Sequence, residues 1–448
     1  MRHCTLPIAR TLTLCAAAAV CSCQTALAQG TEPQAHACPA GLPAGARCFT
    51  GEDGQGAFYW VAIPANWDRQ VLVVHAHGGP ANTGAAKRER GQEDLARWAV
   101  TVKAGHAWVA STYRRGGYGV TMAAQDSERA RQVFVQHFGP ARRTLLHGQS
   151  YGGGVAAKAA EIYAAPDGRP GPFDGVLLTS GVLGGGAAAY SFRLDLRVVY
   201  QYVCQNHPRA DEAPYPLWQG LPAGNTLKPA DLAARIDQCT GVRQPPAQRS
   251  AQQQTNLATI STVLRIAPDS LIGHMNWATW LFHDLTQLRL GGRNPFGNIG
   301  VQYRGSGDDA ALNAGVLRYR ADPQAVAELA PDSRPDGRVM VPVLTLHAID
   351  DPTAFVELES AYREQIERAG NGHLLVQAFS AEAQHSYLAD AQYPALFAAL
   401  LDWIDNGDKP TARKLLGLCR GYEAEFGQGC AIQPDYQPQP LDTRVAPR

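Results

Sequence analysis

Short apolar runs alternate with amphipathic stretches along most of the chain. Several of the apolar runs are continuous, as strands buried on both faces of a parallel sheet require. The strand candidates are Ala57–Ile63, Val71–His75, Ala107–Thr112, Arg143–His147, Gly175–Thr179, Val341–His347 and His373–Phe379. Between them lie helical patterns such as Asp126–Phe138, whose apolar positions 130, 133, 134 and 138 share one helix face. The alternation predicts an α/β fold, a mostly parallel sheet with helices on both faces.

The regular alternation stops between about Gly184 and Pro335. This segment holds a Gln/Pro-rich stretch at Gln244–Gln254 and a Trp-rich helical stretch near Ser270–Leu288. We expect a largely helical insertion here. The residues after Gly407 are Pro-rich without strong periodicity and predict a tail. The expected division is a targeting segment at 1–28, a sheet domain at 29–183 and 336–407, an insertion at 184–335, and a tail at 408–448.

The N-terminus has the order of a secretory signal peptide. Positive charge at Arg2 and Arg10 is followed by the apolar stretch Thr11–Cys21, which is too short to span a bilayer. The small-x-small sequence Ala26–Ala28 predicts cleavage near Ala28 and a secreted or periplasmic protein. Two alternatives stay open, a buried N-terminal helix and lipid attachment at Cys23, whose preceding residues only loosely match a lipobox. No later apolar run is long enough to predict a membrane span.

Cysteine usage agrees with export. Of the ten cysteines, those after residue 28 fall into three close pairs, Cys38/Cys48, Cys204/Cys239 and Cys419/Cys430. Spacing alone does not choose among the pairings, but an oxidising compartment favours bridges, and local bridges are expected. The chain has no CxxC pair or spaced His/Cys quartet that would predict a metal site.

Charge limits the class of partner. The 40 basic and 40 acidic residues cancel, so no global field favours nucleic acid or an anionic membrane surface. A small molecule or a short acyl or peptidyl substrate fits this balance better.

The candidate nucleophile is Ser150, in the sequence Gly148-Gln149-Ser150-Tyr151-Gly152. The motif follows the predicted strand Arg143–His147 and precedes the small-residue helix Gly153–Tyr163. A serine on so tight a turn projects its hydroxyl at the carboxyl edge of the sheet, and flanking glycines avoid clashes. The alternative is a serine that only caps the helix.

Two further loops carry groups that acyl transfer needs. His77-Gly78-Gly79-Pro80 follows the strand Val71–His75 and can offer backbone N–H donors to an oxyanion. The expected oxyanion donors are the N–H groups of Gly79 and Tyr151, and Gly78 is an alternative to Gly79. Alternatively, the Gly-Gly-Pro segment is a turn without a catalytic role.

Downstream, Asp350 and Asp351 follow the strand Val341–His347, and His385 lies between His373–Phe379 and the helix Tyr393–Trp403. Each residue alone could be a surface or capping group. The order Ser, Asp, His, with each residue in a loop after a strand, favours a catalytic triad.

With these motifs the chain resembles the α/β-hydrolase superfamily over Ala57–Ser180 and Met340–Trp403. His77–Pro80 is similar to the segment of proline iminopeptidase-type enzymes, and Tyr113–Gly119 to the arginine-glycine stretch of prolyl-oligopeptidase-like domains. The family pattern His-Gly-x-x-Asp-Pro aligns its acid with Asp351. Ala348 replaces the usual glycine, which leaves Asp350 as an alternative.

The resemblance implies an exported serine hydrolase that forms an acyl-enzyme without a metal or organic cofactor. Ser150 would be the nucleophile, His385 the base and Asp351 the acid. We expect a carboxylic ester as the substrate, because an alkoxide is expelled more easily than an amine. The alternatives are a peptidase or amidase on the same triad and a noncatalytic binding member of the fold. In the insertion, the aromatic side chains of Trp277, Trp280 and Phe282 either line a substrate pocket or pack in the core.

Overall fold

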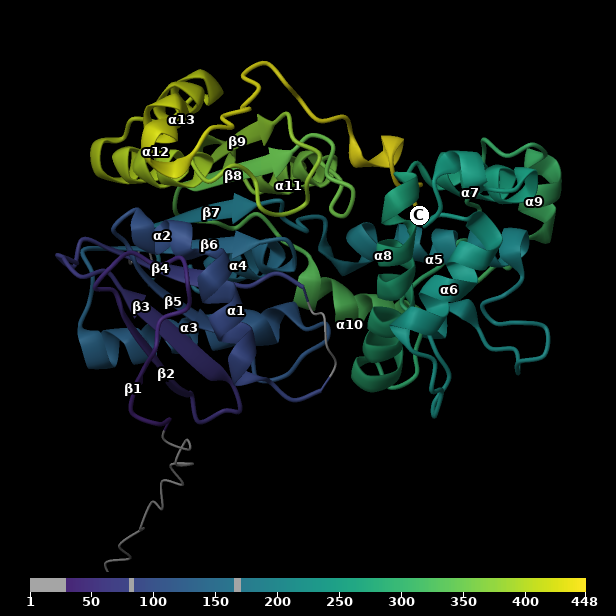
Figure 1. Ribbon diagram of the computed structural model, residues 1–448, viewed down its shortest axis with the longest axis horizontal. Coiled ribbons are helices and arrows are strands. Elements are labelled where there is room, and N and C mark those ends of the chain that lie inside the picture. The colour runs from purple at the N-terminus through teal and green to yellow at the C-terminus, as the bar shows by residue number, and fades with distance from the viewer. Residues whose placement is uncertain (1–29, 80–83, 165–170) are drawn as a thin grey trace, which may run out of the picture.

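The computed structural model describes residues 30–79, 84–164 and 171–448. The predicted signal peptide, its cleavage site and the lipid-attachment alternative at Cys23 therefore lie outside the described residues. Within the described part, no helix is both long and apolar enough to cross a membrane. The chain forms a lobe built on a sheet and a lobe built of helices (Figure 1).

The sheet has nine strands in the order β1-β2-β3-β5-β4-β6-β7-β8-β9. Pairing is antiparallel from β1 to β5 and parallel from β5 through β4 to β9. The strands are β1 Gln34–His36, β2 Arg47–Glu52, β3 Phe58–Ile63, β4 Val71–Ala76, β5 Ala107–Ser111, β6 Arg143–Gln149, β7 Gly175–Thr179, β8 Val343–Ala348 and β9 Leu375–Ser380. Parallel strands end at one edge, so the loops after β4, β6, β8 and β9 can meet there.

Helices cover both faces of the sheet because the strands are apolar on both. In β4, Leu72 and Val74 pack into one core, and Val71 and Val73 pack into the other. The first core contains residues of α3 (Val120–Phe138), α4 (Tyr151–Ile162) and α11 (Leu358–Arg368). The second contains residues of α1 (Arg88–Arg97), α2 (Ala99–Lys103), α12 (Gln392–Asn406) and α13 (Ala412–Phe426). The predicted α/β class is confirmed.

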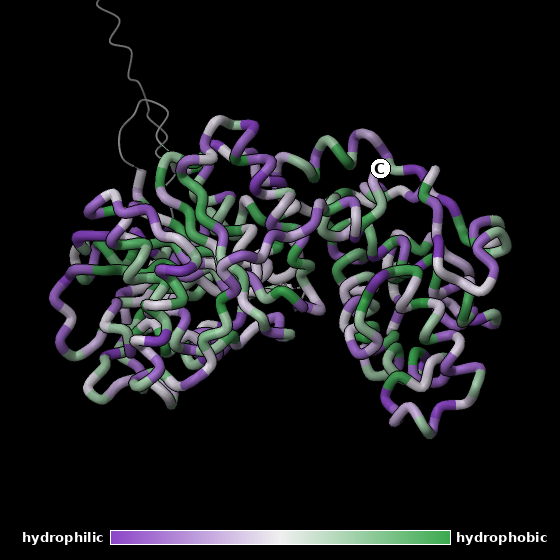
Figure 2. Tube along the Cα trace, turned by 90° about the horizontal axis from the view of Figure 1, so that it is seen from above, coloured by the Kyte–Doolittle hydropathy of each residue, from purple (hydrophilic) through white to green (hydrophobic). Residues whose placement is uncertain are grey.

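The helical lobe is inserted between β7 and β8, as predicted for a helical insertion. Its α-helices are α5 Gly185–Cys204, α6 Pro229–Thr240, α7 Ala251–Leu264, α8 Leu271–Asn276, α9 Asp309–Gly315 and α10 Pro323–Ser333. The Trp-rich stretch is α8 followed by two π-helical segments, Trp277–Leu281 and Asp284–Arg289. From above, the two lobes lie side by side (Figure 2).

A buried carboxylate fastens the helical lobe to the sheet lobe. Asp284 is fully buried and accepts hydrogen bonds from the Arg115 guanidinium at 3.1 Å and the Tyr118 N–H at 2.8 Å. The facing backbone is Gly117, where a Cβ would lie 2.2 Å from the Asp284 carboxylate. The arginine-glycine loop after β5 is therefore a point of contact between the sheet lobe and the helical lobe.

The C-terminal region departs from its prediction. Residues 412–426 were expected to belong to a tail without periodicity, but they form α13, which Thr411 caps through the Lys414 N–H. Only Leu415 and Cys419 are buried on this helix. Leu416, Tyr422 and Phe426 are partly buried against the same core, so the apolar positions recur at helical spacing. The helix was missed because Gly417 and Gly421 lower its helix propensity and Pro-rich sequence follows it. The short strands β1 and β2 were also missed, since β1 is exposed and β2 is polar at both ends.

All three local disulfides are present: Cys38–Cys48, Cys204–Cys239 and Cys419–Cys430. The second joins the end of α5 to α6, and the third joins α13 to the segment that follows it. The prediction of local bridges is confirmed.

Candidate active site

Ser150 lies on a sharp turn between β6 and α4, with φ 59° and ψ −124°. Few L-residues adopt a positive φ, so surrounding packing must hold this conformation. Two glycines make that packing possible. A Cβ on Gly148 would lie 2.1 Å from the Gly152 carbonyl oxygen, and one on Gly152 would lie 1.9 Å from that of Ala76. The first and last positions of the motif are therefore glycines because the turn lies against its own backbone and against the end of β4.

His385 lies in the loop after β9 and joins Ser150 to Asp351. Its Nε2 is 2.6 Å from the Ser150 Oγ, and its Nδ1 is 2.8 and 3.0 Å from the two Asp351 carboxylate oxygens. A carboxylate beside Nδ1 assigns the proton to that nitrogen, which leaves Nε2 to accept from the serine hydroxyl. The Gln149 amide donates to the Ser386 hydroxyl at 2.9 Å and so ties the histidine loop to the serine turn.

Asp351 is held in one orientation by backbone donors. The N–H groups of Thr353 and Ala354 donate to its Oδ1 at 2.8 and 2.9 Å. Burial alone would raise the pKa of Asp351, but the charges and hydrogen bonds of His385 and His347 hold it well below the usual range. The alternative acid Asp350 has an exposed side chain. The structure thus brings Asp351, and not Asp350, into contact with His385.

A second histidine behind the acid was not identified from the sequence. His347 in β8 is fully buried, with Nδ1 3.2 Å from the Glu359 carboxylate and Nε2 3.4 Å from that of Asp351. Burial alone would lower the pKa of His347, but these two carboxylates raise it to about 10. The imidazolium therefore stays charged and offsets part of the negative charge beside the triad. His347 was visible at a strand end, whereas Glu359 on α11 gives no sequence signal.

The turn after β4 lies against the nucleophile. A Cβ on Gly78 would be 3.2 Å from the Ser150 Cβ, and Gly79 has φ 66°. The Gly78 carbonyl accepts from the Arg90 guanidinium at 3.0 Å and from His77 Nδ1 at 2.9 Å. In a planar trans peptide the Gly79 N–H points the opposite way, so these contacts fix its direction. Pro80 lies outside the described residues.

The other predicted donor, Tyr151, is the first residue of α4. An N–H at the first position of a helix has no acceptor within that helix. It is therefore available to a ligand beside Ser150.

The three insertion aromatics differ in environment. Phe282 is fully buried and stacks on Phe296 at a ring distance of 4.3 Å, so it is a packing residue. Trp277 and Trp280 are partly buried. Trp277 stacks at 6.5 Å on Tyr190, which in turn contacts Tyr118 at 5.3 Å. The ring centre of Tyr118 lies 5.6 Å from that of Tyr151, the residue that follows the candidate nucleophile in the sequence.

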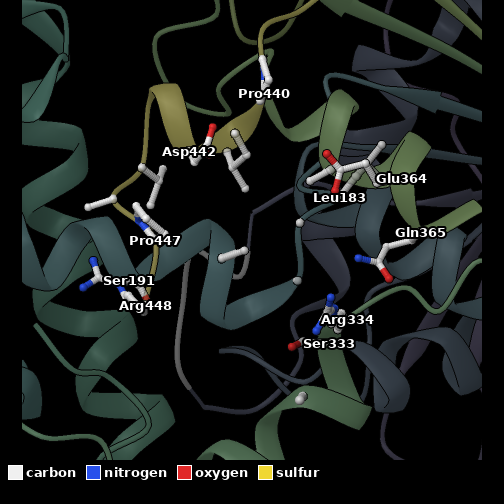
Figure 3. A pocket seen from close by; sticks show the side chains of 18 of the residues that line it. Leu183, Ser191, Ser333, Arg334, Glu364, Gln365, Pro440, Asp442, Pro447 and Arg448 are labelled. Atoms are coloured by element: carbon white, nitrogen blue, oxygen red, sulfur yellow. The ribbon is translucent and has the colours of Figure 1, made fainter. Parts of the chain in front are cut away.

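A cavity of about 470 Å³ lies between α5, α10, α11 and the C-terminal segment, and not at Ser150 (Figure 3). Its lining includes Leu183, Ser333, Gln365 and Leu441 but none of Ser150, Asp351 and His385. This cavity is separate from the triad. Within the described ranges, no group of three or more His, Cys, Asp or Glu residues is arranged to hold a metal ion.

The sheet order, the helices on both faces and the serine turn after β6 define the α/β-hydrolase fold, as the motifs predicted. No family model matches the chain, and no curated protein matches its sequence.

Solved structures similar to this chain include three esterases or lipases. One is a hormone-sensitive lipase from a metagenome library, with 12% identity, TM-score 0.39, and coverage of 86% of this chain and 88% of that chain. The rice cell wall degrading esterase LipA from Xanthomonas oryzae has 14% identity, TM-score 0.40, and coverage of 80% and 90%. An esterase from Aspergillus oryzae has 14% identity, TM-score 0.39, and coverage of 82% and 80%.

Proposed function

We propose that this protein is a serine hydrolase that cleaves carboxylic esters through an acyl-enzyme. The proposal depends on one observation, the continuous hydrogen-bonded chain from the Ser150 hydroxyl through His385 to Asp351. A strained serine, a histidine with its accepting nitrogen on that serine, and a buried carboxylate on the other nitrogen match the roles of nucleophile, base and orienting acid.

In the proposed mechanism, Ser150 Oγ attacks the acyl carbon as its proton passes to His385 Nε2. The oxyanion accepts from the N–H groups of Gly79 and Tyr151, each worth on the order of 3 kcal/mol in comparable sites. His385 then delivers the proton to the leaving alkoxide, which departs. A water molecule repeats the attack on the acyl carbon, with His385 again as the base, and Ser150 is released.

Hydrolysis by the purified protein tests this proposal. We expect p-nitrophenyl esters with short acyl chains to be cleaved with a higher kcat/KM than aminoacyl or prolyl nitroanilides of similar size. Ser150→Ala should abolish both activities in a folded protein. If the nitroanilides are cleaved better by roughly tenfold, about 1.4 kcal/mol in transition-state binding, the protein is a peptidase.

We also propose the division of labour within the chain. Residues 29–183 and 336–407 would form the catalytic core and residues 184–335 a cap. Residues 408–448, which were expected to be a tail, would be a C-terminal segment with a local disulfide that packs on the core through α13. Two contacts support a cap over the site. Asp284 binds the loop after β5, and His274 donates to the Pro352 carbonyl, next to Asp351, at 2.9 Å.

Export is part of the proposal, because three disulfides suit an oxidising compartment. Intact mass and N-terminal sequencing of the secreted or periplasmic protein should give a start near Gln29 and no free thiols. A lipid on Cys23, or a retained N-terminus, would contradict cleavage near Ala28.

A further inference from the structure

Two buried arginines lie one turn apart on α5, in the helical lobe, and their surroundings differ. Arg197 is fully buried, and its Nη1 donates to the carbonyls of Gly220 and Ala278 at 3.0 and 3.1 Å. It also donates to the hydroxyls of Thr279 and Tyr215 at 3.2 Å. Four oxygen acceptors thus satisfy the two terminal nitrogens of this buried guanidinium.

Arg193 has far fewer acceptors, although only 4% of it is exposed. Nη1 donates to the Ala189 carbonyl at 3.1 Å, and Nη2 has only a long contact of 3.5 Å to His274 Nδ1. Its Nε has no hydrogen-bond partner, as is also true of Arg197. In the described part of the chain, no carboxylate forms an ion pair with either arginine, so the two differ in the number of their hydrogen-bond acceptors. Burial accordingly lowers the pKa of Arg193, to about 10.

The neighbouring histidine does not supply the missing charge. His274 Nε2 donates to the Pro352 carbonyl, and burial lowers the pKa of His274 to about 3. His274 is therefore neutral, with Nδ1 as an acceptor. The other neighbours are aromatic. The Arg193 guanidinium carbon lies 4.6 Å from the ring centre of Tyr190 and 5.6 Å from that of Trp277. Rings of this kind attract a cation but do not neutralise it.

Arg193 is linked to residues next to the triad through two sets of neighbours. Its neighbour His274 binds Pro352, which follows Asp351. Its other neighbour Tyr190 continues through Tyr118 to Tyr151, which follows Ser150. The edge formed by Nε and Nη2, which binds carboxylates side-on, is the poorly satisfied one. A substrate ammonium would be repelled here, whereas a carboxylate would complete the site.

We propose that Arg193 binds a carboxylate of the substrate, so that the preferred substrates are esters bearing an anionic group near the scissile bond. This inference rests on the proposed esterase function. The carboxylate belongs either to the acyl part of the ester or to its leaving group. Substrates that carry the charge on one part or the other distinguish these two possibilities.

The test compares kcat/KM for charged and neutral esters of similar size. For the acyl side the pair is p-nitrophenyl hemiglutarate and p-nitrophenyl pentanoate; for the leaving side it is 4-acetoxybenzoate and 4-acetoxybenzamide. In one of the two pairs we expect the charged-to-neutral ratio to fall roughly thirtyfold in Arg193→Met, as for loss of a charge-assisted hydrogen bond. Arg197→Met, the matched control, should keep the wild-type ratio. An unchanged ratio in Arg193→Met for both pairs would overturn the inference.

Thermal melting separates a binding role from a structural one. Arg193→Met removes a buried charge that has few acceptors and should not lower Tm. Arg197→Met should lower Tm, because it leaves the buried carbonyls of Gly220 and Ala278 without their donor. If Arg193→Met does not fold, inhibition of the wild-type protein by small carboxylates tests whether Arg193 binds a carboxylate. Benzoate should inhibit competitively at least tenfold more strongly than benzamide, and equal inhibition would refute the site. Hydrolysis of no ester at all would refute the proposed function instead.

Discussion

Asp350 and Asp351 are adjacent in sequence but have opposite environments. The Asp350 side chain is exposed, while that of Asp351 is buried and accepts from His385, Thr353 and Ala354. Only the second can hold the imidazole with its proton on Nδ1. The choice between them follows from the backbone turn after β8, which directs one carboxylate inward.

Replacing these carboxylates one at a time should separate their roles. Asp351→Asn should lower kcat on a short p-nitrophenyl ester by roughly ten-thousand-fold, because an amide donor favours the wrong histidine tautomer. Asp350→Asn, the matched control, should stay within about threefold of wild type, as expected for an exposed side chain. The reverse ranking would move the acid to Asp350.

Among single residues, those whose role depends on a local motif could be identified from the sequence. Ser150 and the glycines around it are contiguous, and His385 and Asp351 each follow a strand, so all three could be predicted to meet at one edge. Glu359 and Arg193 could not. Each acts through neighbours more than ten positions away in the sequence, and a buried charge shows its importance only when its surroundings are known.

The serine turn is the element on which the proposed activity depends, and its geometry is set by close backbone contacts. Gly152 approaches the Ala76 carbonyl so closely that any side chain must displace β4 or the start of α4. A glycine in α13, by contrast, has room for a side chain. Gly417 is exposed, and a Cβ there would meet nothing within 4 Å.

Two glycine-to-alanine variants test that contrast. Gly152→Ala should abolish ester hydrolysis and lower the free energy of unfolding by about 2 kcal/mol through overpacking. Gly417→Ala should raise it by about 1 kcal/mol through helix propensity and keep full activity. Urea denaturation and a p-nitrophenyl ester assay measure both. Full activity in Gly152→Ala would show that the turn tolerates a side chain.

Elements were predictable where their pattern was strong. The parallel strands β4 to β9 are apolar runs, and β7 was predicted with its observed bounds. The helix α13 was missed although its apolar residues recur at helical spacing, because Gly417 and Gly421 lower its helix propensity. Tertiary contact through Leu415 and Cys419, together with the disulfide to Cys430, stabilises it. The insertion could be located by the break in alternation. Its docking through Asp284 could not, since that contact joins residues 166 positions apart.

Across the whole molecule, buried neutral histidines couple stability to pH. His75 and His147 are fully buried in neighbouring strands, with their Nδ1 atoms 3.0 Å apart. Burial, and for His75 also its neighbour His147, lowers the pKa of His75 well below the usual value; burial lowers that of His147 to about 3. An unfolded histidine titrates near 6.5. Their contribution to stability is therefore complete above pH 6.5 and is lost as the pH falls from there toward about 3.

Chemical denaturation at pH 7.5 and pH 5.0 measures this coupling. At pH 5.0 one such histidine costs about 2 kcal/mol relative to pH 7.5, since each pKa unit corresponds to about 1.4 kcal/mol. His147→Gln keeps a polar side chain without the titration and should reduce the loss by about that amount. His373→Gln, at an exposed position, should leave the loss at its wild-type value. An unreduced loss in His147→Gln would exclude this histidine as a cause.

Covalent labelling of the nucleophile tests the central claim most directly. The purified protein should react with a fluorophosphonate at a single site, and mass spectrometry of its peptides should find the adduct on Ser150. Ser150→Ala, folded by the criterion of an unchanged melting curve, should not be labelled. A folded wild-type protein without an adduct, or with the adduct on another serine, would contradict the account.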